Sequence, residues 1–64
     1  MVHVRAQVIA EGAGGVVVEL RWREPERSKD VELYQVLRLR HGKIVDMQDF
    51  EHRRAALRAA AAEP

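Results

Sequence analysis

Hydrophobic and polar residues alternate along most of the chain, which is the pattern of strands that bury one face. The first alternating segment is VHVRAQVIA (2–10), with one side of the strand formed by Val2, Val4, Ala6 and Val8 and the other by His3, Arg5 and Gln7. Similar segments follow at 16–23, 31–40 and 43–49. The pattern therefore predicts four strands.

The segments between these strands differ in kind. EGAGG (11–15) is predicted to be irregular, because its glycines tolerate positive φ. EPERSKD (24–30) is a polar connector in which Pro25 would interrupt a strand ladder. His41-Gly42 resembles the Asn-Gly signal of a two-residue hairpin turn. The strands are therefore expected to form an antiparallel sheet in sequence order.

The last segment, FEHRRAALRAAAA (50–62), has a helical composition. Asp49 is predicted to be its N-cap, and Glu51 suits the positive end of the helix dipole. Phe50, Leu57 and Ala61 are expected to form its apolar stripe. With only one large aliphatic residue, this helix is expected to pack on the sheet closely but weakly.

Counting outward from the His41-Gly42 turn gives the pairing of the last two predicted strands. Leu37 then faces Asp46, and Gln35 faces Gln48. The three polar residues of these pairs fall on one otherwise apolar face, while the opposite face also carries hydrophobic residues. One short helix cannot cover both faces, so one face is expected to meet another subunit.

Size and composition narrow the classes of protein that fit. A chain of 64 residues forms a single domain (1–64) with a small core, which commonly needs a disulfide, a metal or an oligomer. The absence of cysteine excludes disulfides and thiolate metal sites, which leaves a homo-oligomer, with a dimer as the first choice. The net charge of +1 does not indicate a nucleic-acid or membrane partner, and without a hydrophobic span or a signal-peptide pattern the expected location is the cytoplasm.

Candidate chemistry rests on few residues. Asp46, with Gln35 and Gln48, could act as a general acid or base in an apolar cavity, or these side chains could form a solvated edge or an inter-subunit hydrogen bond. Trp22 and Tyr34 could line a ligand pocket or anchor an interface, or simply pack in the core. The three histidines lack metal-ligand spacing, and no metal or other cofactor is predicted.

The segment YQVLRLRHGKIVDMQDFEHRRAAL resembles the C-terminal hairpin and tail of the SnoaL-like (polyketide-cyclase-like) branch of the nuclear-transport-factor-2-like superfamily. The shared features are a hydrophobic-Arg strand, Gly-Lys-Ile at 42–44, a short strand and the aromatic Phe50. VHVRAQVIAEGAGGVVVELRWRE resembles the strands before that hairpin. The resemblance implies an α+β fold: a curved antiparallel sheet of four strands with one C-terminal helix, which is half of a cone-shaped domain.

Full members of this family have roughly a hundred or more residues, so the chain is either a natural half-size member that assembles or the remnant of a longer protein. The family includes both enzymes and non-enzymatic binding proteins, and its fold alone fixes no chemistry. The leading hypothesis is a non-catalytic, self-associating domain that binds a small hydrophobic ligand between subunits. The alternative is an isomerase or cyclase whose pocket is completed by a second chain and uses Asp46.

Overall fold

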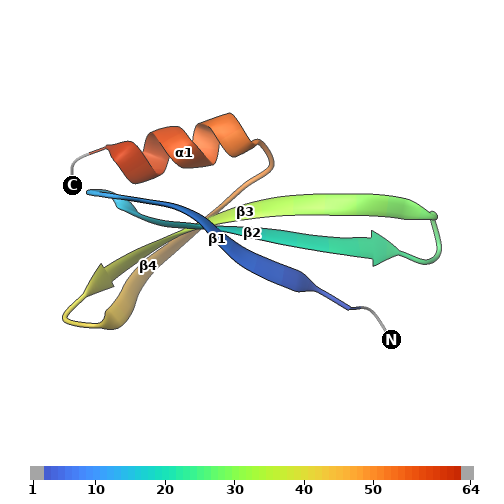
Figure 1. The fold of residues 1–64 in the computed structure, drawn as a ribbon, viewed down its shortest axis with the longest axis horizontal. Coiled ribbons are helices and arrows are strands. Elements are labelled where there is room, and N and C mark those ends of the chain that lie inside the picture. Colours follow the sequence, from blue (N-terminus) through green and yellow to red (C-terminus); the bar gives the residue numbers. More distant parts are fainter. Residues whose placement is uncertain (1–2, 63–64) are drawn as a thin grey trace.

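Four antiparallel strands and one C-terminal helix make up residues 3–62, the part of the chain that this computed structural model describes (Figure 1). The elements are β1 (Arg5–Gly12), β2 (Gly15–Glu24), β3 (Lys29–Arg40), β4 (Lys43–Phe50) and α1 (Arg53–Ala61). The strands lie in the order β1-β2-β3-β4. The α+β class, the strand order and the single helix are therefore confirmed, although the sheet is open rather than curled into half a cone, and Val2 lies outside the described residues.

Both outer hairpins close with two-residue turns. His41 and Gly42 have φ values of 54° and 77°, which confirms the predicted turn with two left-handed residues. The prediction of an irregular 11–15 segment is wrong. Glu11 pairs with Val16 and Gly12 with Gly15, so the ladder continues to the Ala13-Gly14 turn.

Each edge strand contains a β-bulge, which the sequence pattern did not predict. In β1 the register shifts between Val8 and Ala10, so Ile9 is an extra residue. In β4 the pairing of Leu39 with Ile44 is as predicted, but Arg38 then pairs with Asp46 and Val45 is the extra residue. Every later pair differs from the predicted one by one position, and a shift of one position moves a side chain to the other face.

The helix begins later than predicted. Asp49 is not its N-cap: it lies in β4, and the N-cap is His52, which makes no side-chain capping hydrogen bond. The reason is that β4 continues to Phe50, which pairs with Tyr34 and packs against the core. The predicted stripe is also wrong in part, because Ala56 and Ala60 are buried, Leu57 is half-buried and Ala61 is exposed.

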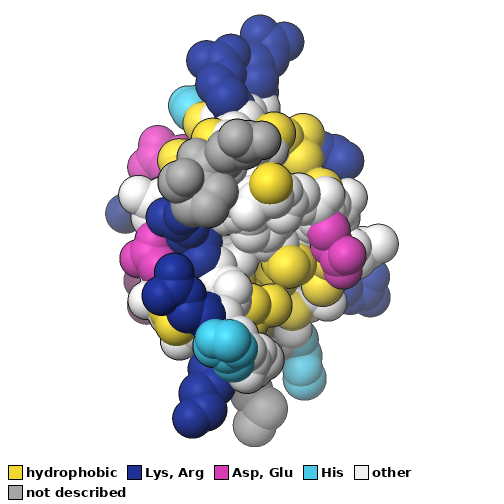
Figure 2. All heavy atoms as spheres, turned by 90° about the vertical axis from the view of Figure 1, so that its left-hand side faces the viewer, with side chains coloured by type: hydrophobic (Ala, Val, Ile, Leu, Met, Phe, Trp, Pro, Cys, Tyr) yellow, Lys and Arg dark blue, Asp and Glu magenta, His cyan; other side chains and the backbone are white. Residues whose placement is uncertain are grey.

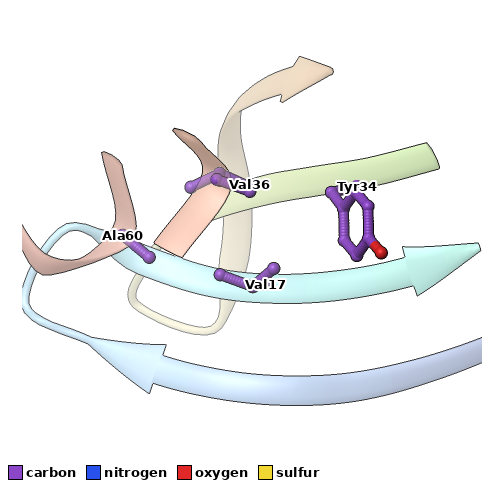
Figure 3. Close-up of a cluster of buried hydrophobic side chains, with 5 residues drawn as sticks. Val17, Tyr34, Val36 and Ala60 are labelled. Atoms are coloured by element: carbon purple, nitrogen blue, oxygen red, sulfur yellow. The ribbon is translucent and has the colours of Figure 1, made fainter. Parts of the chain in front are cut away.

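The hydrophobic core lies between α1 and one side of the sheet, here called the covered face. Its buried members are Val17, Tyr34, Val36, Ala56 and Ala60. Figure 3 shows Val17 and Val36 side by side on neighbouring strands, with Ala60 of the helix near them. The methyl groups of the helix alanines fill little volume, so this core is small, as expected from the scarcity of large residues in the helix.

Glycines allow the helix to lie against the β1–β2 turn. The Gly14 amide donates a hydrogen bond of 2.7 Å to the Ala60 carbonyl oxygen. A Cβ atom at Gly14 would lie 2.6 Å from the Ala59 carbonyl oxygen, and one at Gly12 would lie 2.5 Å from that of Ala60. These distances are too short for any side chain, so glycine at both positions is needed for the observed helix position. In the described part of the chain, the helix is too short and too polar to cross a membrane.

Candidate functional site

The side of the sheet opposite α1, here called the open face, is mainly apolar, with Glu11, Glu24 and Lys29 at strand ends along its margin. Residues that are paired across neighbouring strands project to the same side of the sheet, so the strand register identifies the residues of this face. The open face consists of Ala6, Val8, Glu11, Val16, Val18, Leu20, Trp22, Glu24, Lys29, Val31, Leu33, Gln35, Leu37, Leu39, Ile44, Met47 and Asp49. No element within residues 3–62 packs on it, because α1 lies on the other side (Figure 1).

The hydrophobic residues of the open face are in contact with water in the single chain. Val8, Ile44 and Met47 are 55%, 58% and 57% exposed, and the residues of the two central strands are partly buried only by their neighbours within the sheet. A monomeric protein rarely leaves so large a continuous apolar surface exposed. The open face is therefore the strongest candidate for a functional surface in the described part of the chain.

A hydrogen-bonded polar pair lies within this apolar surface. The Gln35 side-chain amide donates to the Asp49 carboxylate over 3.0 Å. The two residues are paired across β3 and β4 and continue a row that begins with Val8 and Val18. Leu33 and Leu37 flank Gln35 along β3 on the same side. The polar pair thus has hydrophobic neighbours both along β3 and in the cross-strand row.

The predicted group of Gln35, Asp46 and Gln48 does not form. Because Val45 is an extra residue, Asp46 pairs with Arg38 and Gln48 pairs with Val36, which puts both on the covered face. Gln35 lies on the open face and has Asp49 as its partner. The bulge therefore replaces Asp46 by Asp49 as the carboxylate beside Gln35.

The two large aromatic candidates also lie on opposite faces. Trp22 is half-buried on the open face, where it pairs with Val31 near the end of the sheet. Tyr34 is buried on the covered face and belongs to the core (Figure 3). Of the residues predicted to line a pocket or interface, Trp22 and Gln35 are thus on the open face, whereas Tyr34, Asp46 and Gln48 are not.

A charged cluster lies on the covered face beside Tyr34. The Tyr34 hydroxyl donates a 3.0 Å hydrogen bond to one oxygen of Glu32, and the Arg21 guanidinium donates to the other. Arg21 also lies 3.7 Å from Glu19. Hydrogen bonds from Arg21 and then Tyr34 lower the pKa of Glu32, and the pKa of Tyr34 is raised by burial and by its bond to Glu32.

Sequence reasoning missed this cluster, although the signal was present. Arg21 and Glu32 are cross-strand partners, and counting from the polar connector between β2 and β3 would have paired them. Every carboxylate in the cluster already has a basic or hydroxyl partner within the chain. The cluster is therefore explained as cross-strand pairing that borders the core.

A shallow cleft of about 570 Å³ lies at the end of the molecule that carries the two outer hairpin turns. Its lining includes the 11–15 turn region together with Arg38, Arg40 and Asp46. Figure 2 looks at this end and shows basic side chains around a surface of backbone and hydrophobic groups, with acidic and histidine side chains between them. Asp46 is exposed here, and residues 3–62 contain no cluster of three or more residues suited to bind a metal.

Comparison with known proteins found no matching family model, no matching curated protein and no matching solved structure. The resemblance to the SnoaL-like branch thus stays a prediction, and the functional argument rests on the geometry of the chain itself.

Proposed function

We propose that the chain is a non-catalytic, self-associating cytoplasmic domain of the SnoaL-like type, in which the open face of one copy is covered by the open face of a second. The observation that carries this proposal is the continuous apolar surface on the side of the sheet opposite α1. Two such surfaces remove each other from water, and apolar burial is the dominant favourable term in association.

The surface area of the chain supports a second copy as the occupant. The chain exposes 5304 Å². A compact monomer of 7.3 kDa exposes on the order of 4200 Å², so this chain exposes about 1100 Å² more than its mass requires. A standard protein interface buries about 800 Å² on each partner. The excess surface is therefore about the size of one side of a stable dimer interface.

We place a small hydrophobic ligand at the margin of this interface, beside Trp22. A shallow cleft of about 380 Å³ is lined by Trp22 and Val31 of the open face together with His3 and charged residues of β1, β2 and β3. This volume is within the range of small-molecule sites, and an indole beside an aliphatic side chain suits an apolar ligand. The alternative enzyme, with Asp46 as general acid or base, stays a prediction: Asp46 lines the other cleft and pairs with Arg38 on the covered face.

The proposal is tested by measuring the native mass and dissociation constant of the wild-type chain and of Met47→Lys. Met47 lies on the open face and is 57% exposed, so the lysine is tolerated in the single chain but would be buried in the dimer. We expect a wild-type dimer at micromolar concentration and at least a hundred-fold weaker association of the variant.

Val45→Lys is the matched control. Val45 lies on the same strand and is 60% exposed, but as the extra residue of the β4 bulge it has no partner on β3 and is not among the paired residues of the open face. This variant should dimerise like the wild type. A wild-type mass of a single chain, or equal weakening by the two lysines, would contradict the proposal. Native mass spectrometry of freshly purified protein would also reveal a bound ligand.

A further inference from the structure

The hydrogen-bonded pair Gln35–Asp49 has a consequence for the proposed dimer, and the inference below rests on that proposed function. The pair lies in a cross-sheet row with Val8 and Val18, and leucines adjoin it along β3. In the single chain both polar groups contact water as well as each other, since Gln35 is half-buried and Asp49 is exposed. Covering the open face with a second copy removes much of that water.

Once water is removed, the stability of the dimer depends on which groups of the second copy lie against this pair. A buried carboxylate or amide is costly when its remaining hydrogen-bonding positions lie against hydrocarbon, and far less so when they meet another polar group. In a two-fold symmetric dimer the same surface meets itself, so one orientation sets the Gln35 amide of each copy against the Asp49 carboxylate of the other. Other orientations place the pair against the partner's leucines and valines. The pair therefore disfavours those orientations more than it stabilises the favoured one.

The edge strands of the sheet disfavour the addition of a strand from a second copy, which leaves the open face as the contact surface. The outer strands β1 and β4 each carry a bulge, at Ile9 and Val45. A bulge interrupts the regular row of amide and carbonyl groups that a further strand would need. The apolar part of the open face, by contrast, consists of aliphatic side chains from all four strands together with Trp22 near one end, and such a surface alone does not select one orientation.

We propose that the Gln35–Asp49 pair determines the orientation in which the second copy packs on the open face. In this role the pair acts through its mutual hydrogen bond, so removing one partner harms the dimer more than removing both. Gln35→Leu leaves the carboxylate without its amide donor, and Asp49→Leu leaves the amide without its acceptor. Replacing both makes the centre of the open face apolar, so it associates without an orphaned amide or carboxylate there.

The first experiment is a double-mutant cycle on the dimer dissociation constant, measured by analytical ultracentrifugation. Each single leucine variant should weaken the dimer by about ten-fold or more, and the double variant should associate as tightly as the wild type or tighter. Asp49→Asn keeps an acceptor of the same shape and should stay close to the wild type. Single variants that leave the dissociation constant unchanged would overturn the assignment.

The second experiment reports orientation directly. The chain contains no cysteine, so Arg54→Cys gives a single labelling site on the exposed side of α1, away from the open face. Spin labels at this site should give one narrow inter-subunit distance in the wild-type background. The Gln35→Leu/Asp49→Leu background should give a broad or multiple distribution at equal affinity.

The two possible failures are distinguishable. A wild-type dimer whose distance distribution is unchanged by the double substitution would overturn the orientation role alone. A labelled wild-type chain that stays monomeric would overturn the proposed self-association itself, whatever the double variant does.

Discussion

Tyr34 is the residue at which the core and the charged cluster meet. The residue is 5% exposed and packs with Val17 and Val36, while its hydroxyl donates to Glu32 at the border of the core. Burial disfavours the tyrosinate form and raises the pKa of the phenol, and the nearby Glu32 acts in the same direction. The neutral phenol is therefore part of the folded structure.

Tyr34→Phe should lower the free energy of unfolding by about 1 kcal/mol at neutral pH, because one hydrogen bond is lost while the ring is kept. A phenol pKa that is raised on folding stabilises the fold fully below the unfolded value of about 10, and this stability is lost as the pH rises through the folded value. Urea unfolding at neutral and alkaline pH measures both effects. The wild type should lose stability above pH 10 more steeply than the variant, and equal losses would contradict the assignment.

At the scale of the elements, α1 is held by close backbone contact more than by large side chains. Its buried residues are two alanines, and its last turn accepts a hydrogen bond from the Gly14 amide. A helix of nine residues is marginal on its own in water. Its persistence therefore depends on the shape of the β1–β2 turn beneath it.

Gly14→Ala should destabilise the protein by about 2 kcal/mol and reduce its helical circular dichroism, because the added methyl group would collide with carbonyl oxygens of the helix. Gly42→Ala is the control. A Cβ atom there has no neighbour within 4 Å, and only the positive φ of 77° opposes it. This control should lose about 1 kcal/mol and keep its helical signal. Equal loss of helix in both variants would contradict the contact role of Gly14.

The elements themselves could be predicted from the sequence, but their register and faces could not. Alternation predicts four strands because each residue's side is set locally, and His41-Gly42 predicts its turn because both residues tolerate positive φ. The bulges at Ile9 and Val45 leave no comparable local signal. At Ile9 the bulge lets two consecutive apolar residues, Ile9 and Ala10, pack against the core.

The same reason explains what was right and wrong about the candidate site. That both faces of the sheet are partly apolar, and only one is covered within the chain, follows from composition and was predicted. The identity of the polar residues on the uncovered face depends on register. One extra residue at Val45 therefore replaced Asp46 by Asp49.

The molecule as a whole has a large surface area for its volume. The principal extents of 39 × 23 × 15 Å describe a flat, elongated molecule rather than a compact one. A flat molecule has a large area for its volume, so a small core is its only internal source of apolar burial. Stability and association are then expected to be linked.

The midpoint of thermal unfolding should consequently rise with protein concentration. A hundred-fold increase in total chain concentration should raise it by about 5–10 °C if folding and dimerisation are coupled. Circular dichroism melts at several concentrations measure this shift. The Met47→Lys variant should melt at a temperature that does not depend on concentration, and a wild type that behaves in the same way would contradict the linkage.

The bulges of the two edge strands also bear on where assembly stops. The proposed face-to-face dimer would cover the open face of both copies, and the edges that remain carry the bulges at Ile9 and Val45. Growth into open-ended fibres needs an uninterrupted strand edge or a second apolar face, and a paired molecule presents neither within its described residues. The bulges that changed the predicted register would thus also oppose polymerisation of the proposed dimer, which matters for a short chain with a large apolar face.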